Sequence, residues 1–353
     1  MRVGDEERPA EGLTLEGGIA GGSHPAAAED PAAAPRSGVP WLAGLARAPE
    51  VLLLLMILVA GVVFALFNPG FATAGTVGSL LRSIAFTGVI VIGQAIVLIV
   101  GEIDLSVGSV AGMGAIIAGV LMTEVGLPIP AAVLLGVLCG ATVGLVNGVL
   151  ITKIEIPAFV VTLSMLFVAK GFSYVLSGGD PVYPLPAGVT VLAKTDILGL
   201  PSSVWIVLLL VLVFDLAMRR STWGRTAYAT GGNVRTSRLA GISPHRVKIA
   251  AFILSGALSA FAGILLVSRL ARADASIGLG WELVVIAGAV VGGVRINGGA
   301  GTIAGAYLGL LFLQAIQTGL VMAGVDALLQ PVVSGSVLIA AVSVDVLRRR
   351  RFG

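Results

Sequence analysis

Long apolar runs dominate the sequence and constrain the fold more than any other feature. Runs close to 20 residues recur, and each is long enough to cross the hydrocarbon core of a bilayer as a helix. We expect ten of them, at residues 51–67, 79–100, 105–123, 130–151, 157–177, 203–218, 247–268, 281–294, 300–322 and 328–346. Because lipid offers the backbone no hydrogen-bond partner, helices suit such segments. The sequence therefore predicts an all-α, polytopic membrane protein with about ten transmembrane helices.

Composition supports this fold class. Of the 353 residues, 57% are hydrophobic and 12% are charged, whereas soluble domains carry about 25% charged residues. The chain thus has too few charges to cover a water-facing surface. Cys139 is the only cysteine, which excludes an internal disulfide and a cysteine-based metal cluster.

The first 50 residues differ from the rest. They are rich in Ala, Gly, Pro and Glu, with almost no large apolar side chains before Trp41. Such a stretch cannot bury enough surface to offset the entropy lost on ordering, and it lacks the basic start and apolar core of a cleavable signal peptide. We expect a disordered cytoplasmic tail at 1–50, a transmembrane domain at 51–347 and a basic cytoplasmic C-terminus at 348–353.

The distribution of Lys and Arg predicts the orientation. With the N-terminus in the cytoplasm and ten crossings, the inner loops hold nine basic residues and the C-terminus a run of four arginines at 348–351. The outer loops, including the long loop at 178–202, hold only Lys194, Arg269 and Arg272. Cytoplasmic loops of membrane proteins carry an excess of Lys and Arg. We therefore expect both termini in the cytoplasm.

Small residues recur every four positions along three of the apolar segments. The repeats are Gly136, Gly140, Gly144 and Gly148; Ser255, Ser259 and Gly263; and Gly301, Gly305 and Gly309. This spacing places small residues on one face of a helix, where two backbones approach closely. The repeats predict helix–helix packing.

Polar residues within or beside the apolar segments are the candidate functional residues, because they are costly in a membrane. The clearest set lies at 101–108, where a Gly-containing break between two segments predicts a broken helix; a similar break is predicted at 294–300. Asp104 and Ser106 precede a helix, so capping of that helix is one interpretation, and lining of a translocation path or its gate is another. The candidate path or gate residues are Glu102, Asp104, Ser106, Asn147, Glu282 and Asn297.

Signatures of enzymes are absent from the sequence. No G-x-x-x-x-G-K-[ST] motif occurs, so the chain does not bind ATP through a P-loop. The two histidines are far apart and no HExxH motif exists. We expect a protein without catalytic residues, without a cofactor or metal of its own, and without a nucleic-acid partner.

Five segments, in this order, resemble the permease subunits of ribose-type sugar ABC importers. They are Gly101–Ser109, Gly144–Leu163, Gly224–Gly241, Val247–Leu270 and Trp281–Gly305. The resemblance covers about residues 50–347 and identifies that region as a permease domain. The sequence departs from the pattern at Glu102, where glycine is commoner, and at residues 295–297, where small or hydroxyl residues are usual. Branched-chain amino-acid permeases are more distant relatives and a weaker alternative.

The resemblance implies a set of partners. A second permease subunit, identical or paralogous, would share the lipid bilayer. Cytoplasmic ABC ATPase subunits would bind ATP and Mg, and an extracytoplasmic sugar-binding protein would deliver the substrate. The chain would lie in the bacterial cytoplasmic (inner) membrane. It would move a sugar of the pentose, hexose, deoxyhexose or autoinducer-2 class by alternating access.

The long basic loop at 219–246 is the predicted contact with the ATPase. Asn233 follows two glycines and is a good N-cap candidate, which predicts a short helix at 234–240. The resemblance implies that this is a coupling helix; the alternative is a solvated basic loop that only fixes topology. The candidate coupling residues are Arg225, Gly232, Asn233, Arg235, Arg238, Leu239 and Gly241.

Two other classes of function stay open. An ion-coupled secondary transporter would use Asp104 or Glu102 to carry a proton and would work without partners. A structural or receptor membrane protein needs no intramembrane acids. The long basic loop favours the ABC permease, because a solitary transporter needs no docking site for an ATPase.

Overall fold

The structure is a computed structural model that describes residues 49–329 together with 332, 335, 336, 339 and 343. The predicted tail at 1–50, apart from Pro49 and Glu50, and the predicted C-terminus at 348–353 lie outside these residues. Twelve α-helices occur in the described part: α2 (Pro49–Phe67), α3 (Ala74–Ile99), α4 (Val107–Thr123), α5 (Ile129–Lys153), α6 (Ala158–Ser177), α7 (Val191–Lys194), α8 (Ser202–Arg220), α9 (Thr222–Gly232), α10 (Val234–Leu239), α11 (Pro244–Leu270), α12 (Trp281–Val291) and α13 (Ile303–Met322). Short 3-10 helices η1 (Pro69–Ala72), η2 (Ala187–Thr190) and η3 (Ala327–Leu329) and an antiparallel pair, β1 (Asp196–Ile197) and β2 (Leu200–Pro201), complete the described elements.

Seven of these helices are long and apolar enough to cross a membrane: α2, α3, α5, α6, α8, α11 and α13. Two shorter apolar helices, α4 and α12, join them. Nine of the ten predicted segments are therefore helical, and most of the tenth, at 328–346, lies outside the described residues. The prediction of an all-α polytopic membrane protein is confirmed.

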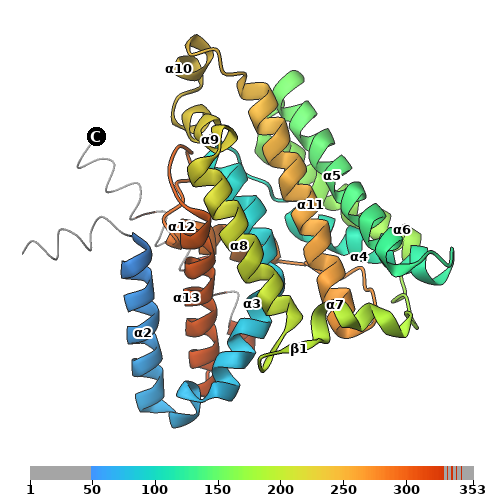
Figure 1. Ribbon diagram of the computed structural model, residues 1–353, viewed down its shortest axis with the longest axis vertical. Helices are drawn as coiled ribbons and strands as arrows, with labels where there is room; N and C mark the ends of the chain where they lie inside the picture. Colours follow the sequence, from blue (N-terminus) through green and yellow to red (C-terminus); the bar gives the residue numbers. More distant parts are fainter. Residues whose placement is uncertain (1–48, 330–331, 333–334, 337–338, 340–342, 344–353) are drawn as a thin grey trace, which may run out of the picture. The chain divides into compact units, whose positions relative to one another are not determined.

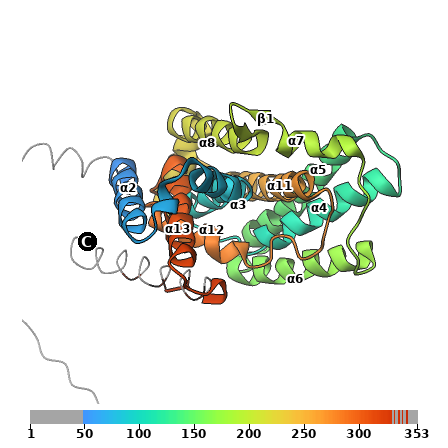
Figure 2. The same cartoon turned by 90° about the horizontal axis from the view of Figure 1, so that it is seen from below.

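Helices α3 and α11 lie at the centre of the bundle (Figures 1 and 2). In its most apolar stretch α3 is 83% buried, whereas α2 is only 6% buried and presents its apolar side chains outward. The glycine repeat of α5 faces α11: a Cβ on Gly144 would collide with the carbonyl oxygen of Phe252, and one on Gly140 with that of Gly256. The predicted role of this repeat in helix packing is confirmed.

Helices α4 and α12 are too short to cross a membrane alone, because 17 and 11 residues span only about 25 and 16 Å. Each follows a non-helical stretch, residues 100–106 before α4 and residues 271–280, mostly turns, before α12. Their starts meet, since a Cβ on Gly108 would collide with the carbonyl oxygen of Gly278 and the reverse also holds. The predicted break at 101–108 is confirmed.

The second predicted break, at 294–300, is also confirmed, because α12 ends at Val291 and α13 begins at Ile303. These residues form the turn of a hairpin between α12 and α13, and the stretch at 271–280 is a further non-helical segment, before α12. Glycines allow the two helices of the hairpin to approach closely. A Cβ on Gly309 would collide with the carbonyl oxygen of Gly288, and a Cβ on Gly292 would collide with the carbonyl oxygen of Gly305. The two backbones therefore lie in direct contact.

The bundle has two distinct ends. One carries α9, α10 and the turn between α12 and α13, and the other carries α7, β1 and the C-terminus of α11 (Figure 1). We call the first the α10 end and the second the α7 end.

Candidate functional site

The stretch before α4 holds a buried carboxylate. Asp104 is 1% exposed. Its Oδ1 accepts hydrogen bonds from the backbone N–H of Ser106 at 2.9 Å and from Ser106 Oγ at 2.6 Å, and its Oδ2 accepts one from Ser255 Oγ of α11 at 3.0 Å. Asn147 of α5 donates from Nδ2 to Ser106 Oγ at 3.1 Å. Four polar side chains thus join the start of α4 to α5 and α11, and we call them the Asp104 cluster.

Capping alone does not describe this cluster. Ser106 precedes α4 with helical backbone angles, and its side chain makes no capping hydrogen bond. The Asp104 carboxylate instead binds groups from its own turn and from α11. Because Asp104 is almost fully buried, it does not border open solvent in this conformation.

Two further contacts hold the stretch at 100–106 in place. Glu102 forms an ion pair with Lys248, in the first turns of α11, and both side chains are less than one-fifth exposed. The hydroxyl of Thr162 in α6 donates to the carbonyl oxygen of Ile103 at 3.4 Å. Glu102 therefore lies toward the α10 end of the bundle, apart from the Asp104 cluster.

The other two candidate path residues lie elsewhere. Glu282, in the first turn of α12, approaches the start of α4, since a Cβ on Gly108 would lie 2.8 Å from its Oε2. Asn297 is exposed in the turn between α12 and α13. The structure thus brings Asp104, Ser106 and Asn147 into contact and leaves Asn297 outside that group.

Helix α10 confirms the short helix predicted after Asn233. The Asn233 side chain accepts a hydrogen bond from the backbone N–H of Thr236 at 3.0 Å and caps the helix. Leu239 is 85% exposed, and Arg235 and Arg238 are exposed on the same short helix. The leucine and the two arginines are thus exposed together at the α10 end.

Five glycines bring three segments together at the α10 end: Gly101, Gly231, Gly232, Gly298 and Gly299. The backbone N–H of Gly299 donates to the carbonyl oxygen of Ile99 at 2.9 Å. A Cβ on Gly231 would collide with the same oxygen, and one on Gly298 would lie 2.8 Å from the backbone of Gly101. We call this set the glycine junction. It joins the end of α9, the end of α3 and the turn before α13 through backbone contacts.

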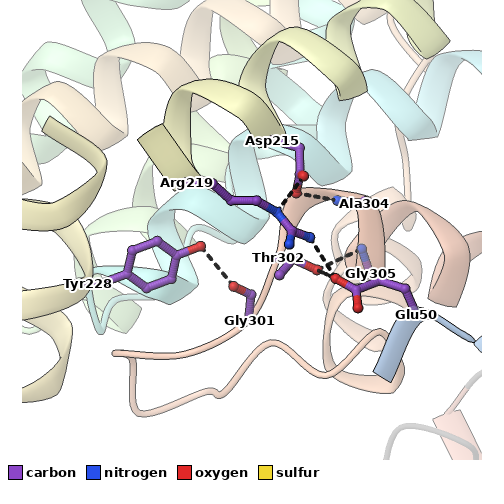
Figure 3. A network of polar contacts seen from close by, with 8 residues as sticks. All are labelled: Glu50, Asp215, Arg219, Tyr228, Gly301, Thr302, Ala304 and Gly305. Carbon is purple, nitrogen blue, oxygen red and sulfur yellow. Dashed lines mark hydrogen bonds and ion pairs between the residues drawn. The ribbon is translucent and has the colours of Figure 1, made fainter. Parts of the chain in front are cut away.

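A polar network lies beside the glycine junction (Figure 3). Arg219, at the end of α8, pairs with Glu50 of α2 through Nη2 and with Asp215 through Nε, both at 2.7 Å. Asp215 Oδ1 accepts a hydrogen bond from the backbone N–H of Ala304 at 3.0 Å. Thr302 donates from Oγ1 to Glu50 Oε1 at 2.9 Å. The network ties α2 and α8 to the start of α13.

Tyr228 of α9 extends this network. Its hydroxyl donates to the carbonyl oxygen of Gly301 at 2.8 Å. Burial raises the pKa of this hydroxyl, and the nearby Asp215 carboxylate acts in the same direction, so the group stays a donor. We call the contacts among Glu50, Asp215, Arg219, Tyr228, Gly301, Thr302 and Ala304 the clasp.

Sequence reasoning missed both the glycine junction and the clasp. The paired glycines at 231–232 and 298–299 were the available signal for the first. The spacing of Asp215 and Arg219, four residues apart on one helix, was the signal for the second. Among the described residues, no group of three or more His, Cys, Asp or Glu side chains is arranged to hold a metal ion.

The sequence matches one family model and several curated proteins. Residues 76–342 match the family described as branched-chain amino acid transport system / permease component. The L-arabinose ABC transporter permease protein AraH of Azospirillum brasilense is 34% identical over 299 residues, which cover 85% of this chain and 88% of the relative.

Two other relatives have similar identities. The ribose import permease protein RbsC of Bacillus subtilis is 35% identical over 80% of this chain and 88% of its own length. The autoinducer 2 import system permease protein LsrC of Salmonella paratyphi B is 36% identical over 72% of this chain and 73% of its own length. No solved structure matches the chain.

Proposed function

We propose that this chain, which belongs to the family of branched-chain amino acid transport system permease components, is the membrane-spanning subunit of an ATP-driven sugar importer. Sugar import is supported by the relatives, whose names state transport of L-arabinose or ribose at 34–35% identity. A relative named for autoinducer 2 keeps that class of substrate within the proposal. The chain has no catalytic role of its own, and ATP with its Mg is bound by the partner ATPase.

The charge distribution supports an orientation in the bacterial cytoplasmic membrane. Nine Lys or Arg residues lie on helix ends and loops at the α10 end: Lys153, Arg219, Arg220, Arg225, Arg235, Arg238, Arg246, Lys248 and Arg295. The α7 end holds fewer basic residues: Lys194 in α7, Arg269 in the last turn of α11, Arg272 just after it, and Arg82 of α3, whose backbone contacts Arg269. Following the excess of basic residues in cytoplasmic loops, the α10 end faces the cytoplasm. Because α2 begins at this end, beside Arg219, the N-terminus is cytoplasmic, and so is the C-terminus in a ten-span chain.

The translocation path in this proposal passes the crossing of α4 and α12. Discontinuous helices that meet within the membrane form substrate sites in many transporters. The Asp104 cluster lies at the start of α4, and Glu282 lies at the start of α12, beside Gly108. The buried Asp104 cluster holds one closed arrangement of α4, α5 and α11. Alternating access then requires these helices to separate on the side that opens, against a second permease subunit that completes the path.

The observation that carries the coupling part of the proposal is the 85% exposure of Leu239 on α10. An apolar side chain of this size, on a capped helix at the basic end of the bundle, suits a groove on a cytoplasmic ATPase. Arg235 and Arg238 would flank it, and arginine is enriched among the residues that dominate protein interfaces. Closure of the ATPase on ATP would then push on α10, while an extracytoplasmic sugar-binding protein delivers the sugar at the α7 end.

The experiment is co-purification of the ATPase encoded beside this chain. We expect Arg238→Glu combined with Leu239→Glu to lower ATPase recovery by about tenfold or more without affecting insertion. The control is Val191→Glu with Lys194→Glu, which makes the same charge change on the exposed face of α7. Wild-type recovery with the α10 variant would place the dock elsewhere. Sugar uptake by proteoliposomes holding only this chain would favour an ion-coupled transporter instead.

A further inference from the structure

We propose that the clasp and the glycine junction carry the motion of α10 to α13 and to the break before α4, with Asp215, Arg219 and Tyr228 as the positioning residues of this connection. The inference rests on the proposed function, because it assumes that an ATPase moves α10. It assigns a role to side chains that contact neither the sugar nor the ATPase in that proposal.

The first step is the short and rigid connection between α8, α9 and α10. A single residue, Ser221, separates α8 from α9, and its side chain accepts a hydrogen bond from the backbone N–H of Gly224 at 2.9 Å. A single residue, Asn233, separates α9 from α10; its backbone N–H donates to Ala229 of α9 and its side chain caps α10. Because each joint is one capped residue, displacement of α10 displaces α9 and the end of α8.

The second step is the set of polar contacts that join α8 and α9 to the start of α13. Asp215 binds the backbone N–H of Ala304, within the first turn of α13, where the helix dipole also favours a carboxylate. Arg219 reaches Thr302 through the shared Glu50 carboxylate. Tyr228 binds the carbonyl oxygen of Gly301 from the opposite helix, α9. Helices α8 and α9, together with Glu50 of α2, thus contact three residues at the start of α13, namely Gly301, Thr302 and Ala304, as Figure 3 shows.

The third step leads from the turn before α13 to the Asp104 cluster. The hydrogen bond from Gly299 to Ile99, and the contact of Gly298 with Gly101, tie this turn to the end of α3. Backbone atoms meet here without intervening side chains, so no rotamer change can absorb a displacement. Three residues after Gly101 lies Asp104, which holds α4 against α11 through Ser255.

Exposure argues against a purely stabilising role for the clasp. The Arg219 side chain is 47% exposed, whereas those of Glu50 and Asp215 are 22% and 16% exposed. Solvent screens the exposed guanidinium, which lowers the contribution of these ion pairs to stability. The same contacts nevertheless fix the relative positions of α2, α8 and α13. A side chain that links three helices at the membrane surface, next to the proposed docking helix, is placed to transmit motion.

The first experiment measures coupling in the complete importer. Proteoliposomes contain this chain, the neighbouring ATPase and the sugar-binding protein, and radiolabelled L-arabinose and ribose serve as probes. We expect Arg219→Ala to lower sugar imported per ATP hydrolysed by about tenfold, and Tyr228→Phe by about threefold, while ATPase recovery stays at the wild-type level. The matched controls are Arg220→Ala, one residue away, and Tyr174→Phe, at an exposed tyrosine. Neither side chain makes a hydrogen bond or an ion pair with another described residue.

The second experiment needs no sugar. Spin labels on Thr222→Cys and Arg295→Cys, in a Cys139→Ala background, report the distance between α9 and the α12–α13 turn. We expect this distance to stay constant between the nucleotide-free and the ATP–vanadate states in the otherwise wild-type chain. It should change in the Arg219→Ala chain, because the clasp no longer holds the two elements together.

The outcomes separate the two proposals. Wild-type transport per ATP in both clasp variants, or a label distance that behaves alike with and without Arg219, would overturn the transmission role. A loss of ATPase recovery in the clasp variants, equal to that of the α10 variant, would also overturn it by making these residues part of the dock. Failure of the proposed function appears differently, as an absence of ATPase binding to the wild-type chain. If Arg219→Ala does not insert, Tyr228→Phe decides the question.

Discussion

At the scale of single residues, the Asp104 cluster shows how the chain satisfies a buried polar group with hydrogen bonds from its own side chains and backbone. Every polar contact described for Asp104 points toward its carboxylate, and the donors come from α11 and from its own turn. In a site that water does not reach, each donor left without an acceptor costs about 1–3 kcal/mol. Asp104 therefore contributes to stability as well as to the proposed gate.

Replacement of Asp104 tests this arrangement. We expect Asp104→Ala to lower the free energy of unfolding by about 2 kcal/mol, because it leaves the Ser106 backbone N–H without its acceptor. Asp104→Asn keeps one acceptor oxygen and should cost less. Asp180→Ala, at an exposed position, should change stability by less than about 0.5 kcal/mol. Thermal unfolding in nanodiscs measures all three, and equal stability of the Ala and Asn variants would contradict the hydrogen-bond assignment.

Neighbouring glycines in α9 give a second test at this scale. A Cβ on Gly231 would collide with the carbonyl oxygen of Ile99, whereas a Cβ on Gly232 meets nothing within 4 Å. We expect Gly231→Ala to destabilise the protein by about 1–3 kcal/mol through overpacking. Gly232→Ala should be neutral or slightly stabilising, since alanine favours the helical backbone. The same change at adjacent positions controls for local propensity, and similar melting temperatures for both variants would rule out the close contact at Gly231.

At the scale of elements, sequence reasoning succeeds where the signal is local. Apolar length located nine helices, the four-residue glycine repeat located the face of α5 that packs on α11, and the residues around Asn233 located α10. It also located the interruption at 294–300, but it did not show that α12 and α13 pack closely on either side of this turn. A glycine-rich stretch looks the same in a bent helix and in a hairpin turn, and only the close contact of Gly288 with Gly309 distinguishes the two.

The distant partners within the clasp, and the crossing of α4 with α12, could not be predicted from the sequence for a related reason. Asp215 and Arg219 look like an ordinary pair on one helix, and their partners Glu50 and Ala304 are distant in the sequence. Gly108 and Gly278 meet only once the whole bundle is assembled. Contacts between residues so far apart in the sequence produce no repeating pattern in either segment from which they could be predicted.

The packing of α5 on α11 yields a prediction at this scale. We expect Gly144→Ala to destabilise the bundle by about 1–3 kcal/mol, because the added methyl group meets the backbone of Phe252 in α11. Gly171→Ala, in α6, is the control: its Cβ would meet nothing within 4 Å. Melting temperatures in nanodiscs compare the two, and a Gly171 variant that is as unstable as the Gly144 variant would show that the effect is not one of packing.

At the scale of the whole molecule, the proposed functions are separated along the membrane normal. The α10 end gathers the basic residues, the clasp, the glycine junction and the exposed Leu239, whereas the α7 end gathers a short helix and a β-hairpin. The Asp104 cluster and the crossing of α4 with α12 lie between these ends. In this proposal, motion driven by ATP would therefore start at the α10 end. It would reach the translocation path through backbone contacts before it reaches the α7 end.

This arrangement depends on the orientation, which labelling of single cysteines tests. In a Cys139→Ala background, Thr236→Cys lies on α10 and Val191→Cys on α7, and both positions are exposed. We expect an impermeant maleimide to label Val191→Cys in intact cells with a permeable outer envelope, and Thr236→Cys only after the membrane is opened. The reverse pattern would place α10 outside, where no ATPase could reach it, and would remove the basis for both the proposed coupling and its transmission through the clasp.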